Sequence, residues 1–370
     1  MPAILSGFTV GITGDRRADE QAELLRRRGA TVLHGPMIET RPLADSPELR
    51  AACEAILADP PQMLVATTGV GIRSWMEAAD GLGLGDRLRA TLAGAETVAR
   101  SPKAAGALLT ADLPLHWQAA GERTQDVLDH LASRDLAGVR VAVQRDGAED
   151  PILADLLTAR GAEVVDVPIY RWILPTDPAP AHRLLDALGD RQLDAITITS
   201  SPALANLLAI ADGRADAAAI RVALAEDVLM ACVGPVCTAS ARQVGVTRIV
   251  QPDRFRLGSM VKRLADALAA TAWVLTLGST RLAVQGGLAT VDGTEVELTR
   301  REQLLLARLA DAEGSVVAKA ELGRSGWGPG VDLHVVEVTV GRLRARLGVA
   351  GAAVVTVPRR GYRLAATPER

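Results

Sequence analysis

The sequence predicts an α/β protein of two similar lobes, each built on a parallel sheet, followed by a smaller C-terminal module of helices and a hairpin. Short apolar strands alternate with leucine-bearing helices through most of the chain, a pattern typical of parallel sheets covered by helices. A glycine-alanine pair that leads into a strand occurs at both Gly29 and Gly161, which indicates an internal duplication. Near the C-terminus, an amphipathic helix is followed by a short hairpin.

Strand-helix-strand units follow one another along the long N-terminal part. Residues 9–13 are expected to form a buried strand, residues 18–28 a helix, and residues 29–33 the start of the next strand. Further strands are expected at residues 63–67, 96–99, 139–143, 161–165, 195–199 and 231–235, and further helices around Trp75 and at residues 103–108 and 151–159. Because each strand leads into a helix, consecutive strands are expected to run parallel.

Four loops at the ends of these strands are candidate anion-binding sites, because unpaired backbone N–H groups at a helix start attract negative charge. They supply the candidate ligand-binding residues Thr67, Thr68, Arg145, Ser200, Ser201 and Gly234. The arginine and the backbone amides favour an acidic ligand. Many glycine-bearing loops merely turn the chain, and that is the alternative.

Residues 332–347 have the spacing of an amphipathic helix. Its single apolar stripe, at helical period, consists of Val336, Val340, Leu343 and Leu347. Thr339, Arg342 and Arg346 fall on one flank of the stripe, and Arg344 falls on the other. Guanidinium groups bind phosphates and guanine edges, and a helix fits the major groove of DNA. The alternative is a solvated helix that packs only on its own domain.

Residues 354–364 alternate around a Pro-Arg-Arg-Gly turn and are expected to form a hairpin with arginines at its tip. Helix and hairpin together give the candidate DNA-binding residues His334, Thr339, Arg342, Arg344, Arg346, Arg359, Arg360 and Tyr362. From residue 278 onward, 13 Lys/Arg against 10 Asp/Glu give +3, so the rest of a chain with net charge −3 sums to −6. This asymmetry points a nucleic-acid surface to the tail.

Composition excludes several classes of protein. The 370 residues suffice for two or three domains. No apolar run reaches about twenty residues, and the N-terminus lacks a basic-then-apolar signal pattern, so a cytoplasmic protein without membrane contact is expected. Cys53, Cys232 and Cys237 have no metal-binding spacing and are expected to be reduced packing thiols. The histidines are scattered, and neither a metal site nor a cofactor is expected.

Residues 296–306 carry a Thr299–Glu302 capping box, and residues 314–322, Trp327 and residues 361–364 follow in order. In this order and spacing they resemble the winged-helix effector domains of OmpR/PhoB-type response regulators. The resemblance implies a domain at residues 280–366 that binds double-stranded DNA, with a homodimer on the DNA as a further expectation. Two positions depart from the family pattern: Ala318 replaces a capping serine, and Pro358-Arg-Arg displaces the wing arginines.

Four further segments, residues 21–30, 161–171, 196–200 and 233–235, resemble uroporphyrinogen-III synthases, the HemD family, in an order that spans roughly residues 5–268. The family fold has two α/β lobes joined by two extended crossings, with a tetrapyrrole in the cleft between them. Carried over, lobe 1 is made of residues 1–37 and 173–268, lobe 2 of residues 42–165, the crossings of residues 38–41 and 166–172, and the linker to the tail of residues 269–279.

The same resemblance bears on catalysis. Tyr170 matches the family's cleft tyrosine, which makes it the candidate ligand-binding residue and, if the protein is active, the catalytic one; a half-buried strand tyrosine is the alternative. Val236 and Cys237 stand where the family has paired threonines that hold substrate carboxylates. A valine has no hydroxyl to donate, so synthase activity is expected to be absent or feeble.

Three functions follow from these resemblances. The preferred one is a DNA-binding transcriptional regulator whose lobes sense an acidic effector, a tetrapyrrole or a small anion, or mediate dimerisation. A resemblance to actinobacterial synthase-like regulators of nitrate and nitrite assimilation implies a role in that control. The alternatives are a bifunctional protein that keeps uroporphyrinogen-III synthase activity and a protein whose lobes bind only another protein.

Overall fold

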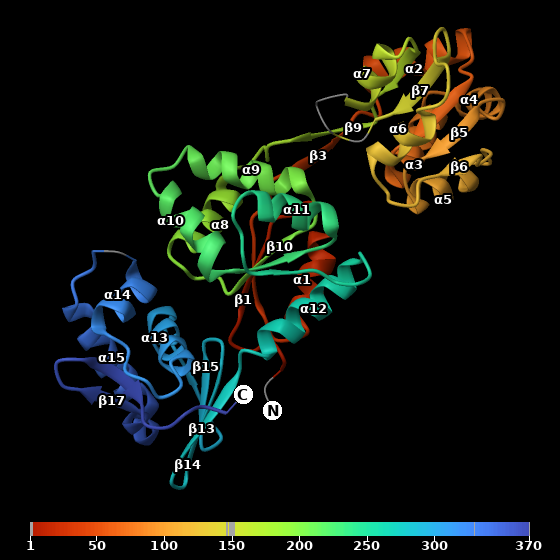
Figure 1. The fold of residues 1–370 in the computed structure, drawn as a ribbon. Helices are drawn as coiled ribbons and strands as arrows, with labels where there is room; N and C mark the ends of the chain where they lie inside the picture. Colours follow the sequence, from red (N-terminus) through yellow and green to blue (C-terminus); the bar gives the residue numbers. More distant parts are fainter. Residues whose placement is uncertain (1–2, 146, 148–151, 329, 370) are drawn as a thin grey trace. The chain divides into compact units, whose positions relative to one another are not determined.

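The computed structural model describes residues 3–145, 147, 152–328 and 330–369. The chain divides into two compact units, one made of residues 1–38 and 174–370 and the other of residues 39–173. The first unit holds lobe 1 and the C-terminal domain, and the second holds lobe 2 (Figure 1). Asp146 in a predicted loop and Pro151 at a predicted helix start lie outside the described residues.

Lobe 1 is built on a five-stranded parallel sheet in the order β12-β11-β10-β1-β2. Its strands are β1 (Thr9–Ile12), β2 (Thr31–His34), β10 (Ala195–Ile198), β11 (Leu229–Cys232) and β12 (Ile249–Val250). Its helices are α1 (Ala18–Arg26), α8 (Ala179–Gly189), α9 (Ser201–Asp212), α10 (Ala217–Val222) with a π-helical turn (Ala223–Asp227), α11 (Pro235–Gln243) and α12 (Leu257–Ala269). Because β1 and β2 pair into a sheet with strands from beyond residue 194, the predicted discontinuous lobe is confirmed.

Lobe 2 has a second five-stranded parallel sheet, in the order β6-β5-β4-β7-β8. Its strands are β4 (Met63–Ala66), β5 (Glu96–Ala99), β6 (Trp117–Gln118), β7 (Arg140–Gln144) and β8 (Glu163–Val167). Its helices are α2 (Pro47–Ala58), α3 (Gly69–Gly81), α4 (Gly85–Leu92), α5 (Pro102–Thr110), α6 (Thr124–Leu131) and α7 (Ile152–Ala159). The two lobes therefore share one architecture, as the repeated sequence pattern predicts.

Two extended segments flank lobe 2 in the sequence and pair with each other. β3 (Glu39–Pro42) and β9 (Tyr170–Ile173) run antiparallel, with Pro42 opposite Tyr170. The second crossing was expected to start at residue 166, and this prediction is wrong. Strand β8 continues to Val167, because that residue is buried and pairs with Gln144 of β7.

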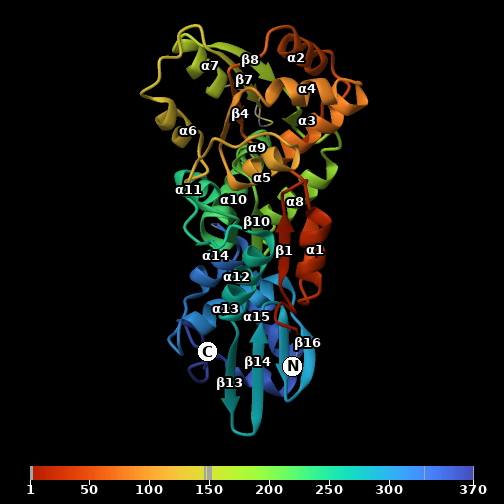
Figure 2. The same ribbon diagram turned by 90° about the vertical axis from the view of Figure 1, so that its right-hand side faces the viewer.

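The C-terminal domain begins with a four-stranded antiparallel sheet of β13 (Trp273–Leu277), β14 (Thr280–Gln285), β15 (Leu288–Val291) and β16 (Thr294–Glu297). Figure 2 shows β13, β14 and β16 running alongside one another. There follow α13 (Arg300–Asp311), α14 (Lys319–Trp327), α15 (His334–Leu347), a 3-10 turn (Gly348–Ala353) and the hairpin of β17 (Val354–Val357) and β18 (Gly361–Leu364). This is the predicted winged-helix arrangement.

The predicted start of the C-terminal domain is also wrong. Residues 269–279 do not form a linker, because β13 occupies most of them and pairs along its whole length with β14. Trp273 and Leu275 bury their side chains in the core of the C-terminal domain beside Leu282 and Val284. The domain therefore starts near residue 273 rather than at residue 280.

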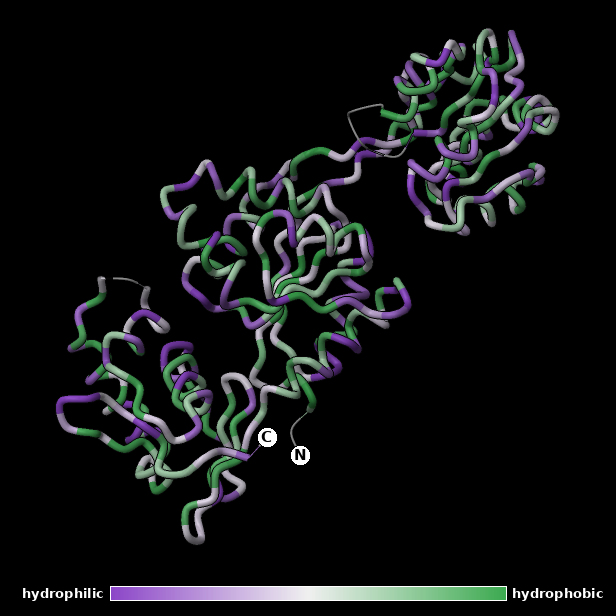
Figure 3. The backbone as a smooth tube through the Cα atoms, in the orientation of Figure 1, coloured by the Kyte–Doolittle hydropathy of each residue, from purple (hydrophilic) through white to green (hydrophobic). Residues whose placement is uncertain are grey.

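The central strands of both lobes are buried on both faces. Every residue of β4 and of β10 is buried, as expected for parallel strands covered by helices on both sides. Figure 3 shows this as hydrophobic colouring along the central strands. Helix starts carry the expected caps at Ser46, Thr68 and Ser101, whereas Ala318 gives α14 no side-chain cap, as predicted. Among the described residues, no helix is long and apolar enough to cross a bilayer.

Candidate DNA interface and ligand loops

Helix α15 buries one stripe of its surface and leaves the rest for other contacts. The predicted stripe of Val336, Val340, Leu343 and Leu347 is confirmed, each residue being at most 1% exposed. Thr339, Arg342 and Arg346 line one hollow beside the start of α13. Arg344 instead reaches the hairpin. The two predicted flanks of the helix are therefore distinct in the folded domain.

Arg346 is held by a buried carboxylate. Its guanidinium forms a 3.0 Å ion pair with Glu302, which is 1% exposed. The same carboxylate accepts hydrogen bonds from the backbone N–H and the hydroxyl of Thr299, both at 2.8 Å, so the predicted capping box is present. Arg346 thus fixes α15 against α13, and its contact with DNA stays a prediction.

Arg344 supports the hairpin. Its guanidinium donates to the carbonyl of Val354 at 2.6 and 2.8 Å and to the hydroxyl of Thr356 at 2.8 Å, and it lies 5.8 Å from the ring centre of Tyr362. Tyr362 is only 5% exposed and belongs to the core of the domain. Tyr362 is therefore not among the exposed candidates for DNA contact, because its ring packs inward between the hairpin and α15.

The remaining candidates lie at the surface. Arg342 of α15 is exposed, as are Arg359 and Arg360 at the hairpin tip, and within the described parts of the chain none of the three side chains forms a hydrogen bond or an ion pair. His334 lies 3.5 Å from Glu337, whose pKa is lowered mainly by its hydrogen bond with Lys319. Three unpaired guanidiniums on a helix and a hairpin tip suit binding to phosphates and guanine edges.

In lobe 2 the predicted loop residues meet around a glutamine that the prediction did not single out. Gln144 is fully buried, and its side-chain oxygen Oε1 accepts hydrogen bonds from the N–H groups of Thr67 and Thr68 at 3.2 and 3.0 Å. The hydroxyl of Thr68 lies 3.3 Å from that of Tyr170 and caps α3 through the N–H of Gly71. The loops after β4 and β7 thus close on each other, and two amides expected to be open to an anion are already used.

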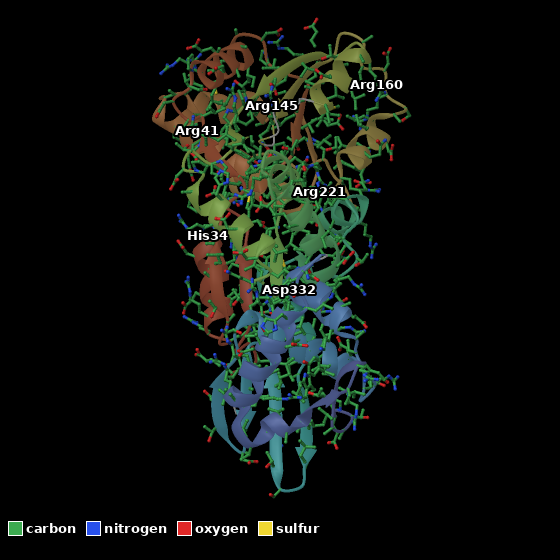
Figure 4. The ribbon with its side chains drawn as sticks, turned by 90° about the vertical axis from the view of Figure 1, so that its left-hand side faces the viewer. His34, Arg41, Arg145, Arg160, Arg221 and Asp332 are labelled. Atoms are coloured by element: carbon green, nitrogen blue, oxygen red, sulfur yellow. The ribbon has the colours of Figure 1, made fainter. Side chains whose placement is uncertain are left out.

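Arg145, marked in Figure 4, is also engaged within lobe 2. Its guanidinium pairs with Asp166 through both Nε, at 3.1 Å, and Nη2. Tyr170 is 4% exposed and packs beside Trp172. Both observations modify the expectation of an open cationic loop, since a ligand at Arg145 would have to share that guanidinium with a carboxylate. Asp166 is the residue whose role the sequence pattern did not reveal.

In lobe 1 the candidate residues lie at the carboxyl ends of neighbouring strands β10 and β11. Ser200 and Gly234 are the N-cap residues of α9 and α11, and neither caps its helix through a side chain. Ser201 lines a groove of about 500 Å³ between these two helices, together with Leu204, Ala205 and Val244. The three residues therefore lie at neighbouring strand ends within lobe 1, and their role in ligand binding stays a prediction.

Val236 and Cys237, which replace the paired threonines of the family, offer no hydroxyl at the start of α11. Val236 is 59% exposed and Cys237 is 5% exposed. The hydroxyl of the next residue, Thr238, donates to the side-chain oxygen of Gln251 at 2.6 Å and is therefore already engaged. Neither the exposed valine nor the buried cysteine has a hydroxyl that could hold a carboxylate.

The cysteines are buried thiols. Burial raises the pKa of Cys232 to about 12, and burial also raises the pKa values of Cys53 and Cys237. The indole N–H of Trp75 lies 3.3 Å from the sulfur of Cys53. In the part of the chain that the structure describes, no cluster of three or more His, Cys, Asp or Glu side chains has the arrangement of a metal site.

Comparison with known proteins agrees with this architecture. Residues 19–262 match the family model of uroporphyrinogen-III synthase HemD. The chain belongs to this family. Residues 293–364 match the family model of the C-terminal domain of transcriptional regulatory proteins. The protein is therefore a HemD-family chain with a DNA-binding domain of the OmpR/PhoB type at its end, which is the domain organisation of a transcriptional regulator.

Individual relatives cover the two parts separately. A mutant uroporphyrinogen III synthase of Thermus thermophilus is 33% identical and superposes with a TM-score of 0.60, over 71% of this chain and 99% of that one. The uncharacterized protein YjjA of Bacillus subtilis is 27% identical over 70% of this chain and 96% of its own length. The transcriptional regulatory protein PrrA of Mycobacterium tuberculosis is 33% identical over 26% of this chain and 42% of PrrA.

Proposed function

We propose that this HemD-family protein is a transcriptional regulator that binds double-stranded DNA through α15 and the hairpin of β17 and β18. The observation that supports it best is the placement of Arg342, Arg359 and Arg360, which are exposed and unpaired within the described residues, on a helix and a hairpin tip of a winged-helix domain. The synthase-like lobes act as a sensor or dimerisation body. A homodimer on DNA would place two such domains on a symmetric site.

The test is to measure DNA binding by the full chain, using the fluorescence anisotropy of a labelled duplex over a range of salt concentrations. Because phosphate contacts release counterions, the logarithm of the binding constant should fall linearly with the logarithm of salt concentration. Replacing Arg359, a candidate phosphate contact, with alanine should reduce the magnitude of this slope by about 0.9. A folded chain that binds no duplex even at low salt would remove the proposal.

The lobes are proposed to have little or no synthase activity. The support is Val236 and Cys237 at the start of α11, where no hydroxyl is offered to a substrate carboxylate. The test is incubation with hydroxymethylbilane and separation of the uroporphyrinogen isomers that form. Enzymatic type III isomer at a rate comparable to an ordinary synthase would establish the bifunctional alternative.

The effector is proposed to be an acidic molecule, either a carboxylated tetrapyrrole or a small anion such as nitrate or nitrite, which would connect the protein to nitrogen assimilation. The helix starts at Ser200, Ser201 and Gly234 in lobe 1 support this class of ligand. Calorimetry with uroporphyrinogen analogues, nitrate and nitrite, each with and without duplex DNA, tests it. An effector that changes DNA affinity must bind differently when DNA is present.

Two single variants assign the binding groups lobe by lobe. Tyr170→Phe removes the hydroxyl that lies 3.3 Å from Thr68 in lobe 2, and Ser200→Ala removes the side-chain hydroxyl before α9 in lobe 1. If both variants keep full ligand affinity and full DNA response, these residues are not part of the effector site.

A further inference from the structure

Among the described residues, lobe 1 and the DNA-binding domain, which share one unit, touch at two places besides the covalent connection. The first contact joins residues 3–7 of lobe 1 to the turn between β14 and β15. The side-chain amide of Gln285 donates to the carbonyls of Ala3 and Ser6, both at 3.0 Å, and the N–H of Gly287 donates to Gly7 at 2.7 Å. Gly7 has φ +81, and a Cβ there would lie 2.5 Å from the carbonyl of Gln285, so the approach requires glycine. This contact holds the first sheet of the DNA-binding domain against the N-terminal residues of lobe 1.

The second contact depends on side chains and lies farther from the connection. Arg191, in the segment after α8, donates to the carbonyls of Ser325 and Arg324 at 2.7 and 3.2 Å. These carbonyls belong to the last turn of α14, where helix carbonyls carry partial negative charge, and the carbonyl of Arg324 also accepts the N–H of Gly328 at 3.0 Å. One lobe 1 arginine thus holds the C-terminal end of a helix in the DNA-binding domain.

Two residues of α13 complete this contact. Gln303 donates to a carboxylate oxygen of Asp194 at 2.9 Å, and Arg300 pairs with the same carboxylate and donates to the carbonyl of Leu193 at 2.9 Å. The side chains of Asp194 and Arg300 are only 10% and 17% exposed, so water screens this pair less than a surface pair. We call Arg191, Asp194, Arg300 and Gln303 the latch.

The latch places lobe 1 beside the flank of α15 that carries its free arginine. Residues 189–192 of lobe 1 and Thr339, Arg342 and Arg346 of α15 line one hollow of about 500 Å³. A helix inserted in the major groove, about 12 Å wide, has a phosphate backbone on each side. The hollow has the size of a small-molecule cavity rather than of a duplex. Lobe 1 therefore lies where a DNA backbone next to Arg342 would run.

We propose that the latch is an autoinhibitory contact: while it is closed, lobe 1 shields the Arg342 flank of α15, and DNA binds the open form. The inference rests on the proposed role of α15 in DNA binding. It names the element by which the lobes regulate that role, since a ligand that favours the open form must raise DNA affinity.

The test uses the full chain and a labelled mixed-sequence duplex at low salt. Arg191→Ala removes the bonds to the end of α14, and Gln303→Ala removes one bond to Asp194. Both variants should bind DNA more tightly than the parent, Arg191→Ala by about fivefold or more, the lower range of allosteric coupling. The matched control is Arg221→Ala, which also loses a lobe 1 arginine, but one paired with Asp212 of the same lobe at 2.6 Å.

Loss of a positive charge alone weakens DNA binding, so simple electrostatics predicts the opposite sign for Arg191→Ala and no gain for the control. If Arg191→Ala does not fold, as judged by circular dichroism, Gln303→Ala decides. Unchanged or weaker binding by a folded latch variant, with binding still reduced by Arg342→Ala, refutes the latch and leaves the DNA-binding function intact. Binding that is insensitive to Arg342→Ala, or absent in every chain, refutes the proposed role of α15 and the latch with it.

Discussion

Arg346 of α15 pairs at 3.0 Å with Glu302 of α13, a carboxylate that is almost completely buried although its partner is 43% exposed. The carboxylate also receives two hydrogen bonds from Thr299, which begins α13. One side chain therefore contacts both the start of α13 and the last turn of α15. The orientation of α15 depends on this polar contact as well as on its apolar stripe.

Glu302→Ala should destabilise the C-terminal domain by about 1–3 kcal/mol, because it removes the capping box and leaves the Thr299 N–H without its acceptor. Amide hydrogen exchange, followed for peptides of α13 and α15, should accelerate accordingly. The matched control is Glu321→Ala, whose ion pair with Arg308 is more than a third exposed on both sides, so its loss should cost less than about 1 kcal/mol. Equal effects of the two variants would show that the buried network contributes nothing special.

Gln144→Leu should destabilise lobe 2. The substitution keeps the volume of the side chain but leaves the N–H groups of Thr67 and Thr68 without their shared acceptor. Each unsatisfied buried donor costs about 1–3 kcal/mol. Hydrogen exchange around the loop after β4 is the measurement, and Gln125→Leu, which loses only an exposed bond to Asp129, serves as control. Protection that survives Gln144→Leu would contradict the closed loop.

The buried thiol of Cys232 predicts a loss of stability at alkaline pH. Burial raises its pKa from 9.0 to about 12. The contribution of the thiol to the free energy of unfolding is therefore complete below pH 9 and is lost as the pH rises toward 12. Urea unfolding at about pH 8 and about pH 10.5 should therefore show a larger decrease for the parent than for Cys232→Ala. Parallel decreases in the two proteins would mean that this thiol is not the titrating group.

Local sequence patterns predicted those structural features that depend on residues close together in the chain. The apolar stripe of α15, the capping box at Thr299 and the strand-helix loops are each determined by residues a few positions apart. The duplicated pattern at Gly29 and Gly161 likewise predicted two similar sheets, because each unit repeats the same hydrophobic order.

Contacts between distant residues could not be predicted in this way. Gln144 closes a loop 77 positions away, and Arg300 reaches Asp194 across 106 positions, so no window of sequence contains either pair. The five residues of β13 were expected to belong to a linker. They form a strand because they pair with β14 and bury Trp273, which are contacts that the local sequence does not reveal. The partners of Arg344 similarly depend on where the hairpin folds back.

Arg342 and Arg344 lie two positions apart on α15 but should give different phenotypes. Arg342 is exposed and unpaired within the described residues, whereas Arg344 bonds to Val354 and Thr356 of the hairpin. Arg342→Ala should leave the domain stable and weaken DNA binding, by about 1–3 kcal/mol and with relaxed specificity at one position if it reads a base. A phosphate contact would instead reduce the salt slope by about 0.9 without a change in specificity.

Arg344→Ala should first loosen the hairpin, because two carbonyl bonds and one hydroxyl bond to β17 disappear together, each contributing about 0.5–1.5 kcal/mol or more for a charged donor. Hydrogen exchange in residues 354–364 should then rise, whereas Arg342→Ala should leave it unchanged. Arg344→Lys should restore little, since an ammonium cannot reproduce the planar fork that reaches two acceptors. If Arg344→Ala left hairpin exchange unchanged while abolishing DNA binding, Arg344 would be a direct DNA contact, as the sequence first suggested.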